Sequence, residues 1–374
     1  MSTGVATIDV REIAIRRRNS FVSSRATTAD RRIILITTAD SDGARGWGEC
    51  SAPEEPRYCE EWTESAWDFI NSILIPTILE ASTTETASLQ GVFDRFRGNR
   101  MAKAAVEEAY YDFEARQKGI PLWRFLGGTE EPIPCGVAIG IMSSIDDLLA
   151  SVDKEARSGY RRIKLKIQRG WDVAVVAAVR RAFPELTLMV DANGAYTLDD
   201  IDVLAQLDAY DLLMLEQPFA PDDLWAFKQA HDRLNTPVCL DESIVSVAST
   251  KAALGLGLCS MVNIKLGRVG GHSVAREIID LCIMEGIPCW CGGQHEAGIG
   301  RAHNLAMAAL MPRVVPAELS ASDRYWDEDI VSPPIQVNEE GYLYLPKAPG
   351  IGFVVNEDLV LRCTVRETHH ERRL

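Results

Sequence analysis

The chain has 374 residues, a formal net charge of −15 and a sequence pI near 5.0. Its lysines and arginines form no long basic run, so nucleic acid and anionic membranes are poor partners and we expect a small-molecule partner. The N-terminal residues lack an apolar signal core and no run of about 18 apolar residues occurs, which favours a cytoplasmic protein without a membrane anchor.

Residues 1–130 are predicted to form an α+β domain. A polar loop, Arg16–Arg31, is expected between the first two strands, and the last helix should stop at Gly119-Ile120-Pro121. The expected strands are Ile8–Ile15, Arg32–Thr38 and Gly46–Cys50, and the expected helices lie near Glu60–Leu79, Ser88–Phe96 and Met101–Lys118.

Residues 131–322 show a repeating unit of a short apolar run and a helix-length segment. The runs are Pro134–Ile139, Ile163–Ile167, Leu186–Asp191, Leu212–Glu216, Val238–Asp241, Met261–Lys265, Ile287–Cys291 and Val314–Leu319. Helix-length segments such as Asp172–Phe183, Leu198–Leu207 and Ser273–Gly286 separate them. This pattern is typical of buried parallel strands and predicts an eight-stranded (β/α)₈ TIM-type barrel. Residues 323–374 are expected to pack back on the N-terminal domain.

Five ionisable residues follow this repeat at nearly constant intervals. Lys166, Asp191, Glu216, Asp241 and Lys265 are separated by 25, 25, 25 and 24 residues, each at the end of an apolar run. A (β/α)₈ barrel carries its active site on the face where the C-terminal strand ends meet. We therefore expect the five side chains to belong to one site.

The three carboxylates among them, Asp191, Glu216 and Asp241, suit a hard divalent cation. Mg²⁺ takes oxygen ligands and retains positions for water or substrate, and Mn²⁺ is an alternative. A single acid at a strand end often caps the next helix instead. Three acids at equal spacing favour the metal hypothesis, with oxygens at about 2.0–2.5 Å from the ion.

Three lysines near these carboxylates are candidates for a catalytic base. Lys164 and Lys166 lie two apart on one strand, so both should point into the barrel, and Lys265 should arrive from the opposite side with Arg268 close by. Beside a dication the lysine pKa values would fall, which makes a competent base. The alternatives are a buried ion network and Schiff-base chemistry. The combination favours abstraction of a proton α to a carboxylate through an enediolate intermediate.

Several stretches of the sequence resemble the enolase superfamily, specifically the o-succinylbenzoate synthase / N-acylamino acid racemase family of the muconate-lactonising subgroup. Inside the barrel they are Lys164–Ile167 (KLKI), Asp191–Leu198 (DANGAYTL), Leu215–Phe219 (LEQPF), Leu240–Ser243 (LDES), Asn263–His272 (NIKLGRVGGH), Cys291–Gly293 with Gly298–Ala302, and Ala321–Ile330. Outside the barrel they are Gly46–Cys50 and Met101–Gly128.

The resemblance implies an N-terminal α+β capping domain, completed by the C-terminal segment, over a modified TIM barrel. By position, Asp191, Glu216 and Asp241 would bind magnesium, Lys166 and Lys265 would be the acid/base lysines, and Lys164 would support Lys166. Arg268 matches the arginine of members that racemise N-acylamino acids. Dehydration needs one acting lysine, and racemisation needs both, from opposite faces. Family members generally form homo-oligomers, dimers or octamers.

The substrate pocket is expected to depart from the family. Ala138 replaces a small polar residue, Gln294 and His295 replace apolar groups, and Glu318 stands where Asp is more usual. His295 is a candidate pocket residue, less readily a base or part of a surface loop. We assign the substrate-binding role to Arg25, Ala138, Asn193, Gly293, Gln294, His295 and Glu296. Another subgroup enzyme, such as a cycloisomerase or an epimerase, and a non-catalytic barrel are the alternative interpretations.

Overall fold

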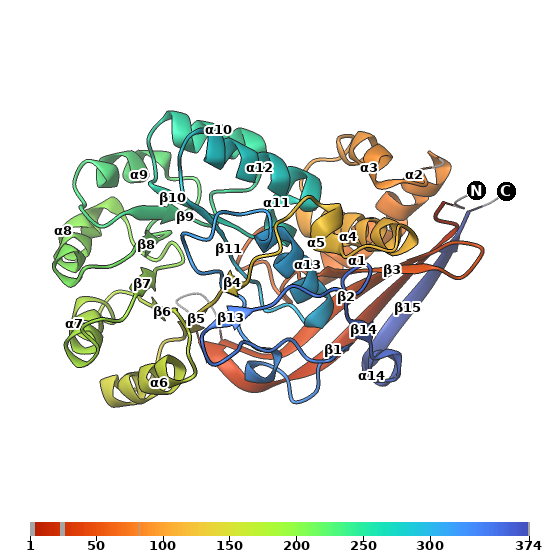
Figure 1. Cartoon of the computed structure of the whole chain (residues 1–374). Helices are drawn as coiled ribbons and strands as arrows, with labels where there is room; N and C mark the ends of the chain where they lie inside the picture. Colours follow the sequence, from red (N-terminus) through yellow and green to blue (C-terminus); the bar gives the residue numbers. More distant parts are fainter. Residues whose placement is uncertain (1–3, 23–26, 82, 373–374) are drawn as a thin grey trace.

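The structure, a computed structural model, describes residues 4–22, 27–81 and 83–372. Two main sheets lie on opposite sides of the molecule, an antiparallel sheet and a parallel sheet (Figure 1). The antiparallel sheet has the spatial order β15 (Thr364–Glu371), β1 (Thr7–Val22), β2 (Thr27–Ala39) and β3 (Arg45–Cys50). None of the helices in these described ranges is long and apolar enough to cross a membrane.

The prediction of a loop over Arg16–Arg31 is wrong, because the first two strands extend into this stretch. In the structure β1 continues to Val22 and β2 begins at Thr27, and Phe21 pairs with Thr28 across an irregularity in the register. The polar residues of this stretch suggested a loop, but Arg17 and Arg18 have partners far along the chain. Arg17 is buried with its guanidinium over the Tyr325 ring, and Arg18 pairs with Asp327 at 2.8 Å.

The helices of the N-terminal half cover one face of the antiparallel sheet. They are α1 (Thr63–Phe69), α2 (Ile75–Glu80), α3 (Thr86–Phe93), α4 (Arg100–Gln117) and the short α5 (Leu122–Phe125), with a π-helical turn (Ile70–Leu74) between α1 and α2. Gly46 and Gly48 let α4 approach β3 closely, because a Cβ at either position would lie about 2 Å from a backbone oxygen of α4. We call the antiparallel sheet with α1 to α4 the capping part.

The parallel sheet holds the predicted repeat. Its strands are β5 (Gly136–Ile139), β6 (Arg162–Lys166), β7 (Leu188–Asp191), β8 (Leu215–Glu216), β9 (Val238–Leu240), β10 (Met261–Ile264) and β11 (Cys289–Cys291), in sequential spatial order. Almost every residue in them is buried, as expected for strands covered on both faces. Neighbours pair in parallel register, so successive strand ends meet along one edge of the sheet.

The predicted eighth strand, Val314–Leu319, is not a strand in the structure. The sheet has seven strands in the described residues, and the eighth position is held by single contacts. Ala317 forms an isolated parallel bridge with Cys135, and the Glu318 amide donates to the Cys291 carbonyl at 2.8 Å. Pro316, which has no N–H, cannot extend such a ladder. The chain therefore connects both edges of the curled sheet without forming a regular strand.

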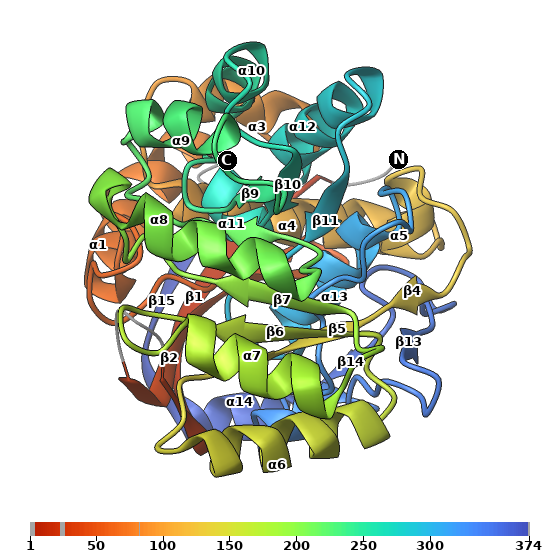
Figure 2. The ribbon, with the colours of Figure 1, turned by 90° about the vertical axis from the view of Figure 1, so that its left-hand side faces the viewer.

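Helices surround the parallel sheet (Figure 2). They are α6 (Ile145–Arg157), α7 (Val173–Ala182), α8 (Ile201–Leu204), α9 (Leu224–His231), α10 (Val247–Gly255), α11 (Leu266–Val269), α12 (His272–Met284) and α13 (Gly298–Ala308). On α7 the buried residues are Val175, Val176 and Val179, a helical stripe that faces the strands. The predicted helix at Leu198–Leu207 is divided into α8 and flanking 3₁₀ turns. We call this sheet with its helices the barrel part.

The C-terminal segment returns to the capping part. It contains β12 (Val331–Ser332), β13 (Tyr342–Leu343), β14 (Val354–Val355), α14 (Glu357–Cys363) and β15, and β13 pairs with β4 (Ile133–Pro134). β15 pairs antiparallel with β1 along its edge.

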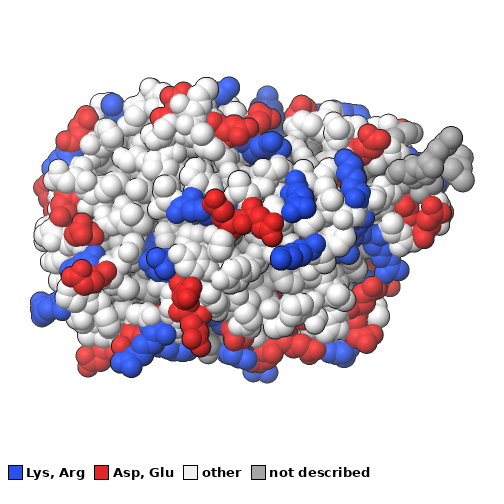
Figure 3. All heavy atoms as spheres, in the orientation of Figure 1, with Lys and Arg blue, Asp and Glu red and all other residues white. Residues whose placement is uncertain are grey.

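On the face in Figure 3, acidic and basic side chains are interspersed over a mostly uncharged surface.

Candidate active site

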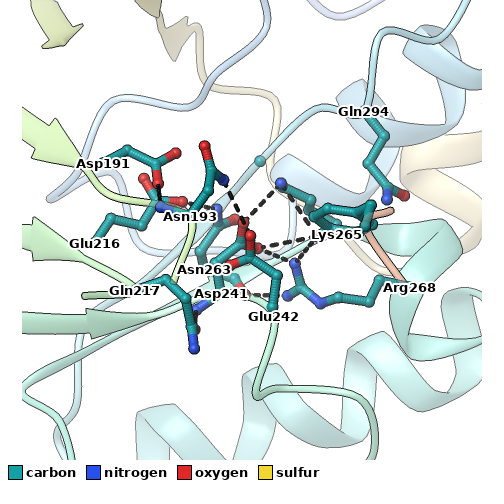
Figure 4. Close-up of polar contacts among 12 residues, drawn as sticks. Asp191, Asn193, Glu216, Gln217, Asp241, Glu242, Asn263, Lys265, Arg268 and Gln294 are labelled. Atoms are coloured by element: carbon teal, nitrogen blue, oxygen red, sulfur yellow. Dashed lines mark hydrogen bonds and ion pairs between the residues drawn. The ribbon is translucent and has the colours of Figure 1, made fainter. Parts of the chain in front are cut away.

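The five residues of the predicted constellation lie at neighbouring strand ends. In the parallel register Lys166 is paired with Asp191, and Asp191 is paired with Glu216. Asp241 and Lys265 directly follow β9 and β10. All five side chains are buried, and the close-up view shows Asp191, Glu216, Asp241 and Lys265 gathered in one region (Figure 4). The repeat therefore places the five residues at successive strand ends along one edge of the sheet.

The three carboxylates have the chemistry of a hard-cation site. Burial and the nearby Asp191 carboxylate raise the pKa of Glu216 to about 8, which reflects how unfavourable a further buried negative charge is there. As the side chains stand, no three Asp, Glu, His or Cys groups in the described ranges converge closely enough to hold one ion. Asp191 and Asp241 instead turn toward lysines. A dication would compete with those ammonium groups for the same oxygens, and the oxygen donor set fits it.

Lys166 is held from the β7 strand end. Its Nζ lies 2.6 Å from Asp191 Oδ2 and donates to Asn193 Oδ1 at 2.7 Å. Asn193, at a left-handed φ of 46°, also donates through Nδ2 to Glu242 Oε1 at 3.0 Å. Burial opposes ionisation of Asp191, but the ammonium groups of Lys166 and Lys164 hold its pKa below the ordinary range. These contacts fix the direction of the Lys166 ammonium.

Lys265 is held on the other side of the carboxylates. Its Nζ donates to Asp241 Oδ2 at 2.8 Å, and Arg268 contacts Asp241 Oδ1. The guanidinium of Arg268 is itself anchored, since it donates to the backbone oxygens of Ile244 at 2.8 Å and Asn263 at 2.6 Å. Burial lowers the pKa of Lys265, but Asp241 outweighs it and the net pKa is well above the ordinary value. Without a metal, this amine is a stable cation.

Lys164 lies deeper, between the carboxylates and Glu318. Its Nζ is 3.1 Å from Asp191 Oδ2, 3.2 Å from Glu216 Oε2 and 2.5 Å from Glu318 Oε2. Beneath it the fully buried Arg162 lies 3.9 Å from Glu318 Oε2 and stacks on Trp290 at 4.7 Å. The sequence placed Glu318 in the substrate pocket, at a position where the family usually has Asp. In the structure it is the counter-charge of Lys164.

The predicted substrate-binding residues have different surroundings in the structure. Asn193 contacts Lys166, as described above, and Gln294 Oε1 lies 3.5 Å from Ser51 Oγ of the capping part. Ala138 is buried on β5 and accepts a hydrogen bond from Arg324 through its backbone oxygen. The Glu296 carboxylate turns back into its own loop, where Oε2 accepts from the Gln294 amide at 2.8 Å. Gly293, next to Gln294, packs closely against the Glu318 backbone oxygen. Arg25 lies outside the described residues.

His295 lies between the capping part and the lysines. Its Nδ1 is 3.5 Å from Arg17 Nη2, and its ring packs edge-on against Tyr325 at 5.5 Å. Burial lowers the His295 pKa well below its ordinary value, and the cations of Arg17, Arg31, Lys166 and Lys265 lower it further. A neutral imidazole surrounded by cations fits a pocket wall better than a general base that must gain a proton.

Sequence reasoning did not identify three polar groups of the site. Asn263 donates to Glu216 Oε1 at 2.7 Å, Glu242 accepts from Asn193, and the Tyr58 hydroxyl lies 3.3 Å from Lys265 Nζ. Asn263 and Glu242 adjoin residues of the repeat, so strand position could have indicated them. Tyr58 comes from an irregular segment between β3 and α1, and no local pattern pointed to it.

The arrangement can hold an anionic substrate between two lysine side chains. Along the sheet, Lys166 on β6 and Lys265 after β10 flank the three acidic strand ends, and Arg17 and Arg31 add positive charge near His295. Positive groups fixed in a buried site stabilise negative charge that develops on a substrate, because little solvent screens them. The geometry is suited to forming and protonating a carbanion next to a carboxylate.

Comparison with known proteins matches both halves of the chain to one group. Residues 5–127 match the model described as mandelate racemase / muconate lactonizing enzyme, N-terminal domain. Residues 147–359 match the model described as enolase C-terminal domain-like.

Similar proteins extend over nearly the whole chain. An o-succinylbenzoate synthase of Geobacillus kaustophilus is 43% identical over 97% of each chain. An N-succinylamino acid racemase of Amycolatopsis sp. is 41% identical over 94% of this chain and 95% of its own. A crystal structure of an enolase superfamily member from Listeria innocua has a TM-score of 0.95 at 36% identity and covers 100% of both chains.

Proposed function

Because this chain belongs to the enolase superfamily, in the family of mandelate racemase and muconate lactonizing enzymes, we propose that it removes a proton α to a substrate carboxylate. It is an enzyme of the lyase or isomerase type, as its relatives are. The proposed reaction is o-succinylbenzoate synthesis by dehydration, racemisation of N-succinyl or other N-acylamino acids, or both. The relatives named for these two reactions are similar to the chain to nearly the same degree.

The observation that carries the proposal is the pair of lysines. Lys166 lies against Asp191 and Lys265 against Asp241, so a substrate between them would meet one amine on each face. In the dehydration one lysine takes the α-proton and hydroxide leaves. In the racemisation one lysine takes the proton from one face and the other returns a proton to the opposite face. Arg268, fixed against Asp241, supports the racemase activity by the resemblance described above.

Enzymes of this type use a divalent metal, and we propose Mg²⁺, with Mn²⁺ as a substitute, held by Asp191, Glu216 and Asp241. Bound there, the ion would supply positive charge for the negative charge that develops on the substrate carboxylate. Residues of the chain keep positive charge near the substrate and orient the Lys166 amine. Lys164, paired with Glu318, keeps a permanent cation beside Lys166, and Asn193 directs the Lys166 amine.

The far end of the substrate is proposed to be polar or anionic where it meets Gln294 and His295. His295 is surrounded by the cations of Arg17 and Arg31, which would attract a carboxylate. A buried polar group left unpaired by an apolar ligand costs about 1–3 kcal/mol. Strong preference for substrates whose side chain at this end is bulky and apolar would contradict this proposal.

The test is a substrate panel in deuterated water. Purified protein is incubated with Mg²⁺, Mn²⁺ or a chelator and with both enantiomers of N-succinyl and N-acetyl amino acids and the succinylbenzoate precursor. Proton NMR follows loss of the α-proton, polarimetry follows racemisation, and absorbance follows the aromatic product. We expect metal-dependent exchange. Absence of exchange and product across the panel would overturn the proposal, and activity only on other carboxylates would assign the chain to another reaction of the subgroup.

A further inference from the structure

Lys166 and Lys265 are held by residues from different parts of the fold. The ammonium group of each lysine contacts one aspartate oxygen and one uncharged oxygen. For Lys166 the neutral oxygen is Asn193 Oδ1, two residues beyond Asp191 in the same strand-end segment. For Lys265 it is the hydroxyl of Tyr58, which belongs to the segment between β3 and α1 of the capping part. Only Lys265 therefore depends on the capping part for its second oxygen contact in the described residues.

The Tyr58 hydroxyl has contacts that match its hydrogen-bonding capacity. It accepts from Arg268 Nη1 at 3.0 Å and from Lys265 Nζ at 3.3 Å, and it donates to Asp241 Oδ1 at 3.5 Å. A phenolic hydroxyl has one proton and two lone pairs, so these three contacts use it fully. The Lys265 ammonium also lies 4.9 Å from the centre of the Tyr58 ring. Hydroxyl and ring thus act on the same amine.

The Arg268 guanidinium fixes the position of the Tyr58 hydroxyl. Its guanidinium is almost fully buried and bonded to two backbone oxygens, so it has little freedom to follow a moving partner. When the Tyr58 hydroxyl lies against Arg268, its remaining lone pair has a defined direction, toward Lys265. Without it, Asp241 Oδ2 would be the sole anchor of the amine among the oxygens described here.

We propose that Tyr58 is a positioning residue for Lys265, through which the capping part controls proton transfer on one substrate face and leaves the Lys166 face independent. The inference rests on the proposed function, because it assigns Lys265 to proton transfer. Tyr58 acts through Lys265 and takes no proton itself. Its predicted effect is therefore selective for one enantiomer, a signature that a loss of general stability does not produce.

The test compares Tyr58→Phe with Tyr111→Phe. Tyr58→Phe retains the ring over Lys265 and removes the hydroxyl. Tyr111→Phe is the matched control, because the Tyr111 hydroxyl also lies between the capping and barrel parts, 3.1 Å from Ser273 Oγ, but outside the site. Both variants are assayed for α-proton exchange in deuterated water with the separate enantiomers of an N-succinylamino acid, in Mg²⁺.

We expect Tyr58→Phe to slow exchange of one enantiomer by about tenfold relative to the other, the loss that one hydrogen bond to a charged group causes. Racemisation should slow in both directions, because each direction needs both lysines. The other enantiomer should keep exchanging with retention through Lys166. Tyr111→Phe should leave the ratio of the two exchange rates unchanged. Equal slowing of both enantiomers by Tyr58→Phe, or no slowing, would overturn the proposal.

A second measurement keeps the inference separate from the proposed function. The chain has nine lysines, few enough for the Nζ groups to be followed by NMR after isotope labelling, with Lys265→Arg and Lys166→Arg as assignment variants. Tyr58→Phe should shift the Lys265 signal and leave that of Lys166 in place. An unchanged Lys265 signal would overturn the inference even if the enzyme is active. Wild-type protein that exchanges neither enantiomer, with the expected Lys265 shift, would overturn the proposed function alone.

Discussion

At the residue scale, two buried lysines that each face an aspartate invite two explanations, acid/base catalysis and charge neutralisation. Replacing them one at a time separates the two. We expect Lys166→Ala and Lys265→Ala each to lower racemisation by about 10²–10⁴-fold, the range that general acid/base groups contribute. Each variant should still exchange the α-proton on the face of the remaining lysine. Near-normal turnover with a native circular dichroism spectrum would return the lysines to an ion network.

Glu318 carries a second prediction, because it neutralises two buried cations. It lies 2.5 Å from Lys164 Nζ and 3.9 Å from Arg162 Nη1. Burial alone would raise its pKa, but these cations hold it below the ordinary value. Glu318→Gln leaves Arg162 without its nearest carboxylate, so the free energy of unfolding should fall by about 3 kcal/mol. Chemical denaturation measures it. Glu318→Asp, which keeps the charge, should lose less, and equal losses would contradict the ion-pair explanation.

The sequence predicted which ionisable residues stand at neighbouring strand ends, because these residues follow the strand repeat. The spacing of Lys166, Asp191 and Glu216 translates directly into neighbouring strand ends because parallel strands keep a fixed register. Tyr58 could not be predicted this way. Its position depends on how the capping part docks on the barrel part, and a segment without regular structure has no periodicity that reports its partners.

At the element scale, β3, α12 and α13 are joined by a buried pair of histidines. His303 Nε2 lies 2.8 Å from the Trp47 oxygen, and His303 Nδ1 lies 3.0 Å from His272 Nε2. The hydrogen bond between the two rings needs one donor and one acceptor nitrogen, so at least one of the rings must be neutral. Burial lowers the His303 pKa to about 4 and that of His272 well below its ordinary value. Burial therefore favours two neutral rings, and protonation of both would break the hydrogen bond between α12 and α13.

This pair predicts a pH dependence of stability. A histidine whose pKa is lower in the folded than in the unfolded state stabilises the fold above its unfolded pKa and loses that contribution as pH falls toward the folded value. Between pH 7.5 and 5, His303 should account for about 2 kcal/mol of lost stability. Urea unfolding of His303→Gln should show a shallower pH dependence than wild type. His231→Gln, at an exposed position on α9, is the control and should retain the wild-type slope.

Two elements that sequence reasoning placed wrongly have different physical causes. A polar loop was predicted at Arg16–Arg31 because the local sequence does not show that Arg17 and Arg18 contact Tyr325 and Asp327, some 300 residues away. The eighth strand was inferred from an apolar run, but Pro316 has no N–H to donate, and in the described residues the run forms an isolated bridge between Ala317 and Cys135. In the first case long-range contacts, which a local pattern does not contain, decided the structure, whereas Pro316 was visible in the sequence.

At the scale of the whole molecule, the capping part is completed by the end of the chain. β15 pairs with β1 over most of its length, and Arg366 of β15 donates to Glu12 Oε2 of β1 at 2.7 Å. Glu12 is fully buried, and its other cation is Arg32. Arg366 also lies 2.7 Å from Glu64 on α1 and stacks on Trp67 at 4.1 Å. One side chain thus joins the first strand, the last strand and the first helix.

The last prediction follows from this junction. Arg366→Met leaves the buried Glu12 with Arg32 alone, and a weakened buried ion pair should lower the free energy of unfolding by about 1–3 kcal/mol. Arg362→Met is the control, because Arg362 pairs with Glu328 at 3.4 Å with both side chains more than half exposed, and its loss should stay below about 0.5 kcal/mol.

Calorimetry on the same variants tests whether the two parts unfold together. Gly271 of the barrel part lies so close to Glu107 of α4 that a Cβ there would meet its carboxylate, and the Ser273 amide donates to the same carboxylate at 3.2 Å. Contacts this tight across the boundary should couple the two parts in one transition, so Arg366→Met should lower the temperature of a single peak. A separate early peak that appears only in Arg366→Met would show that the capping part unfolds alone, and it would also separate Tyr58 from Lys265 before the barrel part melts.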